Sequence, residues 1–160
     1  MRMMTGLAAA AALVAATAGA QEVRDCDGFE ANAQNLVFPV EESTRSYANG
    51  AIRLIWLDTQ GEPACCSSYL MVLLPSPEEP FDICSIVAGG DGRNGGTPGY
   101  TGFELDRAEA SYDAATGLTV RMHAGVYDGY ESNPVTLSVT VNQQTGEVRA
   151  SQSPTLLYER

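Results

Sequence analysis

The sequence predicts a mainly β fold, either an antiparallel sandwich or a curved antiparallel sheet of about eight or nine short strands. Three observations support this prediction. Residues 52–57 and 68–74 are apolar runs of strand length, residues 135–141 alternate apolar and polar side chains, and turn signals separate such runs along the chain. The alternative class is α+β, because the first part of the chain can hold a short helix.

Residues 1–20 have the pattern of a secretory signal peptide. Arg2 supplies the positive charge, and residues 7–16 form an apolar run that is too short to span a bilayer. Small residues end the segment, so we expect cleavage after Ala20 and a mature chain that begins at Gln21.

The remaining residues, 21–160, suit a single disulfide-stabilised β domain. They contain no second apolar stretch of transmembrane length, and the residues before Cys26 do not resemble those that precede a lipidated cysteine. We therefore expect a soluble protein without a membrane anchor, either periplasmic or secreted. The complete lack of lysine beside nine arginines indicates a GC-rich bacterial genome.

The chain is strongly acidic. Its 20 acidic and nine arginine residues give a net charge of −11, and loss of Arg2 with the leader gives 8 − 20 = −12. This charge argues against nucleic acid and anionic membrane surfaces as partners. It is compatible with a basic protein or a small ligand, although scattered acids also serve solubility alone. Without lysine, Schiff-base and phosphate-loop lysine chemistry are excluded.

Residues 21–35 are polar and can hold a short helix with Asp27 as its N-cap. Residues 35–40 are extended in character, and Pro39 restricts them to an edge or a bulge. Asn49-Gly50 then predicts a hairpin turn, because both turn positions require positive φ. We expect the apolar runs at 52–57 and 68–74 to be central strands, and residues 83–88 to form another strand.

The second half contains two similar turns. Asp113 to Gly117 and Asn142 to Gly146 each begin with a side chain that bonds its own backbone and end with glycine. Between 89 and 99 the chain is too rich in glycine for a regular element. Residues 104–110 are ambiguous between helix and strand. The alternation at residues 135–141 predicts a strand with one buried and one solvent-exposed face.

The four cysteines are Cys26, Cys65, Cys66 and Cys84, an even number that predicts two disulfides outside the cytosol. Three pairings are open. We favour those that send Cys65 and Cys66 to different partners, because adjacent residues of an extended chain point to opposite faces. Such bridges would tie the N-terminal segment and the strand at 83–88 to the start of the strand at 68–74.

The functional alternatives at Cys65 and Cys66 are a strained vicinal disulfide that acts as a redox switch, or a soft metal site, so the protein would be redox-active or copper-handling. The chain has no Cys-x-x-Cys sequence, so thioredoxin-like and covalent haem sites are absent.

His123 is the only histidine, and the alternation of its strand places it with Thr119 and Arg121 on the polar face. A small hydrolase would have to use His123 together with acids. The chain has no Gly-x-Ser-x-Gly sequence, and one histidine is too few for the usual zinc ligand sets. A surface histidine is the favoured interpretation.

The remaining motifs are typical of exposed surface residues and do not indicate a catalytic or metal-binding site. The glycine loop matches part of a calcium-binding repeat in a single imperfect copy, with Gly96 at the aliphatic position. The acidic pairs Glu41-Glu42 and Glu78-Glu79 are typical of a solvated surface. We expect Trp56 in the core. Loops that gather at one end could form a small aromatic binding rim from Tyr100, Phe103, Tyr127 and Tyr130.

The sequence therefore predicts an exported, acidic β domain that acts as a non-enzymatic binding or structural module. It identifies no catalytic residue, metal ligand or cofactor site. A redox or copper-handling protein that uses Cys65 and Cys66, and a small hydrolase that uses His123, remain as alternatives.

Overall fold

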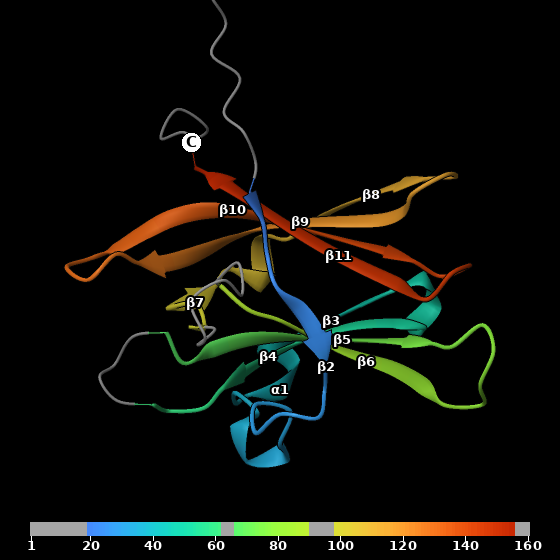
Figure 1. Ribbon diagram of the computed structural model, residues 1–160, viewed down its shortest axis with the longest axis horizontal. Coiled ribbons are helices and arrows are strands. Elements are labelled where there is room, and N and C mark those ends of the chain that lie inside the picture. The colour runs from blue at the N-terminus through green and yellow to red at the C-terminus, as the bar shows by residue number, and fades with distance from the viewer. Residues whose placement is uncertain (1–18, 62–65, 90–97, 156–160) are drawn as a thin grey trace, which may run out of the picture.

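Two antiparallel β-sheets lie face to face in the computed structural model, which describes residues 19–61, 66–89 and 98–155 (Figure 1). The six-stranded sheet has the order β1-β11-β10-β9-β7, and β8 also pairs with β9. The five-stranded sheet has the order β2-β6-β5-β4-β3. The predicted mainly β, antiparallel sandwich is confirmed, with more strands than expected because several strands have only two or three residues.

The six-stranded sheet contains β1 (Gly19–Ala20), β7 (Gly102–Phe103), β8 (Glu109–Asp113), β9 (Gly117–Tyr127), β10 (Ser132–Asn142) and β11 (Glu147–Pro154). The five-stranded sheet contains β2 (Val23–Asp25), β3 (Thr44–Tyr47), β4 (Ile52–Asp58), β5 (Ser68–Pro75) and β6 (Asp82–Val87). The helical elements are short: α1 (Val40–Ser43) and the 3-10 turns η1 (Ala33–Asn35), η2 (Ala48–Gly50) and η3 (Leu105–Arg107).

The main core lies between the two sheets. In β10 every second side chain is buried, as the sequence predicts: Val135, Leu137, Val139 and Val141. They meet buried side chains of β4 and β5, among them Ile52, Leu54 and Val72. Because side chains alternate across a strand, the polar residues of β10 are left on the outer face of the six-stranded sheet.

Local hydrogen bonds close the predicted hairpins. Asp113 Oδ1 accepts the backbone N–H groups of Ala115 and Thr116 in the turn between β8 and β9. Asn142 Oδ1 does the same in the turn between β10 and β11. The hairpin of β3 and β4 is also confirmed, with φ of 56° at Asn49. β5 lies in the centre of its sheet and β4 beside it.

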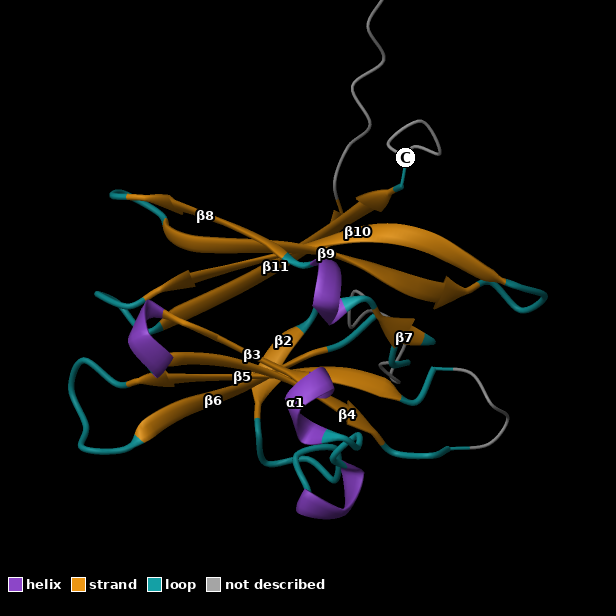
Figure 2. Cartoon of the chain, turned by 180° about the vertical axis from the view of Figure 1, so that it is seen from behind, coloured by secondary structure: helices purple, strands orange, loops and turns teal. Residues whose placement is uncertain are grey.

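A second apolar cluster covers the other face of the five-stranded sheet. Leu57, Tyr69 and Ile86 point to that face and pack against the segment that follows β2. Figure 2 shows α1 on this side, below the five-stranded sheet. Leu36 forms an isolated bridge to Leu57, which holds the segment against the sheet. β4, β5 and β6 are therefore covered on both faces, which explains their continuous apolar sequences.

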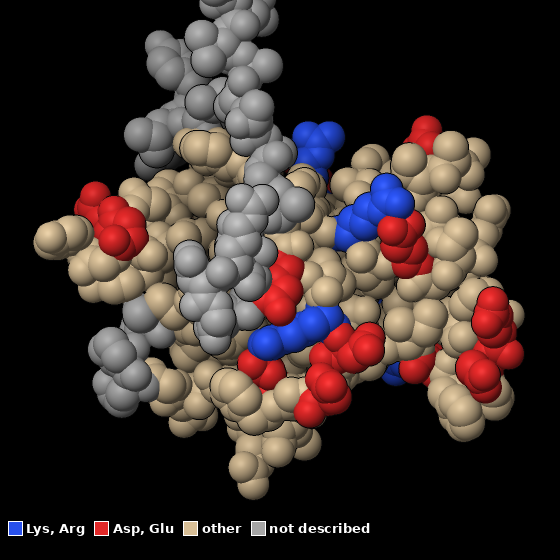
Figure 3. Space-filling view, viewed as in Figure 1, with Lys and Arg blue, Asp and Glu red and all other residues tan. Residues whose placement is uncertain are grey.

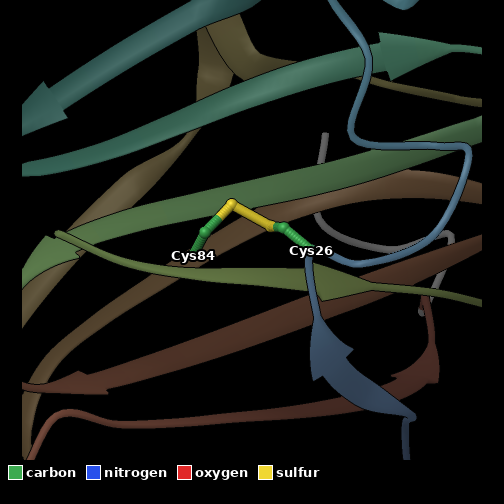
Figure 4. The surroundings of a disulfide bond; sticks show 2 residues. All are labelled: Cys26 and Cys84. Atoms are coloured by element: carbon green, nitrogen blue, oxygen red, sulfur yellow. A yellow bond between two sulfur atoms is a disulfide. The ribbon is translucent and has the colours of Figure 1, made fainter. Parts of the chain in front are cut away.

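Cys26 is bonded to Cys84 with a Cα–Cα distance of 5.5 Å (Figure 4). This bond corrects the favoured pairing, in which both residues joined the Cys65-Cys66 segment. The reason is strand register: Asp25 lies opposite Ser85 in the β2–β6 ladder, so the next position along the chain brings Cys26 opposite Cys84. Cys65 lies outside the described residues, and Cys66 precedes β5.

The expected helix with Asp27 as its cap is not formed. The 3-10 turn η1 begins later, and Asn32 caps it by accepting the N–H of Gln34. The four-residue helix α1 follows Pro39, which serves as its N-cap residue. The ambiguous segment at 104–110 divides into the 3-10 turn η3 and the start of β8.

Most of the predicted leader, residues 1–18, lies outside the described residues, and Gly19–Ala20 form β1. None of the helices within 19–61, 66–89 and 98–155 is long and apolar enough to cross a membrane. The disulfide is typical of proteins that fold outside the cytosol. On the face shown in Figure 3, acidic side chains form several separate groups rather than one patch.

Candidate functional site: a pocket at the end of the six-stranded sheet

A pocket of about 570 Å³ lies where β10 begins and β11 ends. Its volume is within the usual range of small-molecule sites. The lining residues come from the connection between the sheets, from β10, from β11 and from the residue that follows β11: Gln21, Asn133, Pro134, Val135, Gln152, Ser153, Pro154 and Thr155. None of these residues is charged, in a chain whose net charge is −11.

Two prolines end the hydrogen-bonded ladder here. Val135 lies opposite Pro154 in the last pair of the β10–β11 ladder, and Pro134 precedes Val135. Proline has no N–H to donate, so regular pairing weakens at this end. The N–H of Thr155 still donates to the carbonyl of Pro134 at 3.2 Å and keeps the two chains together. The pocket therefore has a fixed backbone around it.

Gln21 closes one side of the pocket. It lies in the connection that passes from β1 in one sheet to β2 in the other. Its backbone N–H donates to the carbonyl of Ala150 at 3.0 Å, which anchors this crossing to β11. The wall is thus held by a hydrogen bond to the same strand that supplies Gln152.

The Gln152 side chain offers an unused acceptor. Gln152 lies opposite Leu137 in the ladder, and its Oε1 atom is buried without a hydrogen-bond partner. A buried carbonyl oxygen without a donor costs free energy, which a ligand donor can recover once the side chain turns this oxygen toward the pocket. The pocket therefore combines an apolar surface, formed by Val135 and the prolines, with the amide oxygen of Gln152 as a hydrogen-bond acceptor.

Asp128 orients a second pocket residue. Asn133 donates its Nδ2 N–H to Asp128 Oδ2 at 2.9 Å, and Asp128 Oδ1 accepts the backbone N–H groups of Tyr130 and Glu131. These N–H groups, that of Glu131 first, hold the pKa of Asp128 below its ordinary value. The ionised carboxylate thereby fixes both the β9–β10 turn and the amide of Asn133.

The structure buries two residues of the predicted aromatic rim and leaves the other two exposed. Tyr100 and Phe103 are buried in the core between the sheets, so they cannot form a rim. Tyr127 and Tyr130 are exposed at the β9–β10 turn, with 94% of Tyr130 accessible. Asn133, which lines the pocket, follows this turn near the start of β10, whereas neither tyrosine is among the lining residues. Trp56 is partly buried against the main core and donates its indole N–H to Ser68 Oγ.

His123 lies on the outer face of the six-stranded sheet, opposite Thr136 and beside the exposed Arg121. This is the predicted polar face, and the pocket residues Val135 and Gln152 lie on the other face of the sheet, although Val135 is only one register position from His123. In the part of the chain that the structure describes, no group of three His, Cys, Asp or Glu side chains could hold a metal ion.

Most of the other residues that the sequence suggested as site residues do not form a binding or catalytic site in the described part of the chain. Residues 90–97 of the glycine loop, and with them the calcium prediction, lie outside the described residues. Glu41 and Glu42 lie in the first turn of α1. Glu78 and Glu79 lie in the loop after β5, where their backbone N–H groups donate to Ser76 Oγ.

Sequence reasoning missed Gln152, Ser153 and Pro154. They stand in an ordinary polar stretch, and they line a pocket only because β11 returns beside the start of β10. Prolines near the ends of both strands were the one signal that could have indicated an interrupted ladder. No protein-family model, curated protein or solved structure matches the chain, so the site rests on its own geometry.

Proposed function

We propose that the protein is an exported binding module whose pocket takes a small, uncharged ligand. The observation that carries the proposal is the combination of an uncharged lining with the buried, unpartnered Oε1 of Gln152. Such a ligand would place apolar surface on Val135 and Pro154 and donate one hydrogen bond to Gln152. The leader-like segment and the disulfide support a role outside the cytosol.

The test uses the isotopically labelled protein and a panel of uncharged probes. The panel contains mono- and disaccharides and N-acetylated, C-amidated dipeptides. NMR titration should shift the backbone amide signals of Asn133, Val135, Gln152, Ser153 and Thr155 with at least one probe class. Gln152→Met keeps the side-chain length but removes the acceptor, so it should weaken that binding about tenfold.

Gln34→Met is the matched control, because Gln34 is an exposed residue of η1 and distant in the chain from the pocket strands. It should leave affinity unchanged. The proposal fails if no probe shifts the pocket signals, or if both glutamine variants bind the probe equally well.

A second candidate function is redox activity of Cys65 and Cys66, which we propose on the strength of the Cys26–Cys84 bond. With that bond made, the two adjacent cysteines are the pair that remains for a second intrachain bridge. A dithiol such as dithiothreitol would supply two electrons and two protons, yielding two thiols and its own cyclic disulfide. Bonds between adjacent residues are strained and therefore easily reduced.

Stepwise reduction followed by alkylation and mass spectrometry tests this second candidate. Cys65 and Cys66 should be alkylated at a lower dithiothreitol concentration than Cys26 and Cys84. Simultaneous alkylation of all four cysteines would count against a redox role.

A further inference from the structure

Strand β8 is an exposed edge of the six-stranded sheet. It pairs with β9 from Glu109↔Arg121 to Asp113↔Gly117, and all five of its residues are exposed. Figure 1 shows β8 at the outer side of this sheet. Among the described residues, no backbone hydrogen bond joins β8 to any segment other than β9.

An edge strand of this kind presents backbone groups to an additional strand. In an antiparallel sheet alternate residues direct their N–H and C=O groups away from the neighbouring strand. In β8 these outward groups face no other described strand. Such a row of donors and acceptors can pair with an extended segment of another chain.

Other edges of the sandwich are better covered. The opposite edge of the six-stranded sheet is met by Gln21, whose N–H donates to the carbonyl of Ala150. On the five-stranded sheet, Arg45 belongs to the edge strand β3, and its guanidinium donates to the carbonyls of Glu41, Glu42 and Thr44. β8 has no comparable side-chain cover among the described residues.

The two faces of β8 differ in chemistry. Glu109, Ser111 and Asp113 share one face, whereas Ala110 and Tyr112 share the other. Tyr112 is 70% exposed, so the apolar side of the strand also lacks a covering layer. The N–H groups of Thr116 and Ala115 hold the pKa of Asp113 below its ordinary value, so that carboxylate stays ionised.

The charges of β8 indicate which kind of strand can pair with it. A second copy of the chain, added antiparallel about Ser111, would place Glu109 opposite Asp113 of the other copy. Like charges directly opposite each other destabilise a strand pair. Lysine or arginine at two positions four residues apart would instead face both carboxylates, and apolar residues between them would lie beside Ala110 and Tyr112. The net charge of −11 attracts the same kind of partner.

We propose that β8 is a docking edge for an extended, basic segment of another protein, which adds to the six-stranded sheet as an antiparallel strand. Backbone hydrogen bonds supply the pairing, and the two carboxylates select the positively charged segment. This interaction is independent of the pocket at the other end of β10, and it extends the proposed binding role to a protein partner.

The test probe is a capped synthetic peptide with the sequence Thr-Lys-Val-Thr-Val-Lys-Thr. NMR titration should shift the amide signals of residues 109–113, and hydrogen exchange should slow at alternate residues of β8 only. The other residues of β8 already bond to β9. Raising the salt concentration should weaken binding, because both acids are exposed. The same peptide with glutamate in place of lysine should not bind.

Two charge-reversal variants test whether binding depends on the charge of β8 itself or on the net charge of the protein. Glu109→Lys should weaken binding of the lysine peptide at least about tenfold. It should allow binding of the peptide in which only the second lysine, the one opposite residue 109, is replaced by glutamate, because the first lysine still faces Asp113. Glu79→Lys makes the same change in net charge at an exposed position in the loop between β5 and β6. It should leave the affinity within about twofold of the parent protein, because it is not on the sheet edge.

Three results would overturn the proposal. The first is that the peptide shifts signals elsewhere but not those of residues 109–113. The second is that the two variants weaken binding equally, which would indicate unspecific attraction to an acidic protein. The third is that the protein self-associates in sedimentation and Glu109→Lys abolishes this, which would make a second copy the occupant of β8.

Discussion

Tyr100 and Phe103 pack against each other between the two sheets, with ring centroids 5.0 Å apart and ring planes inclined by 56°. Phe103 also meets the edge of Trp56 at a centroid distance of 6.0 Å. The hydroxyl of Tyr100 is fully buried and has no hydrogen-bond partner. The ring therefore contributes apolar contacts, while the hydroxyl adds only a desolvation cost.

The Tyr100→Phe variant should be more stable than the parent protein by about 1 kcal/mol, because it removes an unsatisfied buried hydroxyl and keeps the ring. Urea unfolding at neutral pH measures the difference. Tyr130→Phe is the control: Tyr130 is 94% exposed, so its change should stay within about 0.5 kcal/mol. A Tyr100→Phe variant that is clearly less stable would show that the hydroxyl does have a partner in solution.

Stability should also fall at alkaline pH. Burial raises the pKa of Tyr100 above its ordinary value, because the charged phenolate is desolvated. A raised folded pKa contributes stability that is complete below the unfolded value of about 10 and is lost as pH rises above it. Urea midpoints measured across this range should therefore decrease, and they should decrease less in Tyr100→Phe. Equal slopes in both proteins would contradict this explanation.

The ion pair between Arg24 and Glu30 should stabilise the segment after β2. Arg24 Nη2 lies 2.5 Å from Glu30 Oε1, and Glu30 is only 3% exposed. Arg24→Ala should cost about 3 kcal/mol, because it leaves a buried carboxylate without a cation. Arg149→Ala breaks the exposed pair with Glu147 and should cost much less, because solvent screens this pair. Chemical denaturation compares the two, and similar losses would refute the distinction.

Loss of the Cys26–Cys84 bond should lower stability by about 4 kcal/mol, because the bridge closes a loop of 58 residues. The double variant Cys26→Ser, Cys84→Ser removes both sulfurs and leaves no unpaired thiol from this bridge. Thermal and urea unfolding measure the loss. Peptide mapping under non-reducing conditions should find these two cysteines linked in the parent protein, and a link from either one to Cys65 or Cys66 would contradict the structure.

The β9–β10 turn should loosen in acid. The folded pKa of Asp128 is lowered by the N–H groups of Glu131 and Tyr130 and by Asn133. A lowered pKa contributes stability above the unfolded value of about 3.9, and this stability is lost as pH falls through the folded value. NMR titration of Asp128 should show a midpoint below that of a model peptide. In Asp128→Ala, the signal of Asn133 should lose its acid-dependent shift.

Local sequence chemistry predicted much of the sandwich correctly. The alternation from Val135 to Val141 specified which face of β10 is buried, and Asn49-Gly50 specified the β3–β4 hairpin. The turn-opening Asp113 and Asn142 bond the neighbouring N–H groups as expected. These features depend on side-chain alternation and turn geometry within a few residues, so the sequence contains their physical cause.

The disulfide and the aromatic residues were less predictable. Cys26 meets Cys84 because of the β2–β6 register, and no local feature of either segment reveals that register. Likewise, Tyr100 and Phe103 enter the core while Tyr130 stays outside, although all three lie in turn-rich segments. Which aromatic ring is covered depends on the second sheet, not on the residues beside it.

By itself, the sequence determined the fold class, the alternating faces, the main turns and the acidic character of this protein. Only the tertiary structure decided the Cys26–Cys84 pairing, the uncharged pocket at Gln152 and the exposed edge at β8. The physical reason is distance along the chain. Alternation and turns act over a few residues, whereas a pocket or an edge exists only when strands far apart in the sequence come to lie side by side or fail to do so.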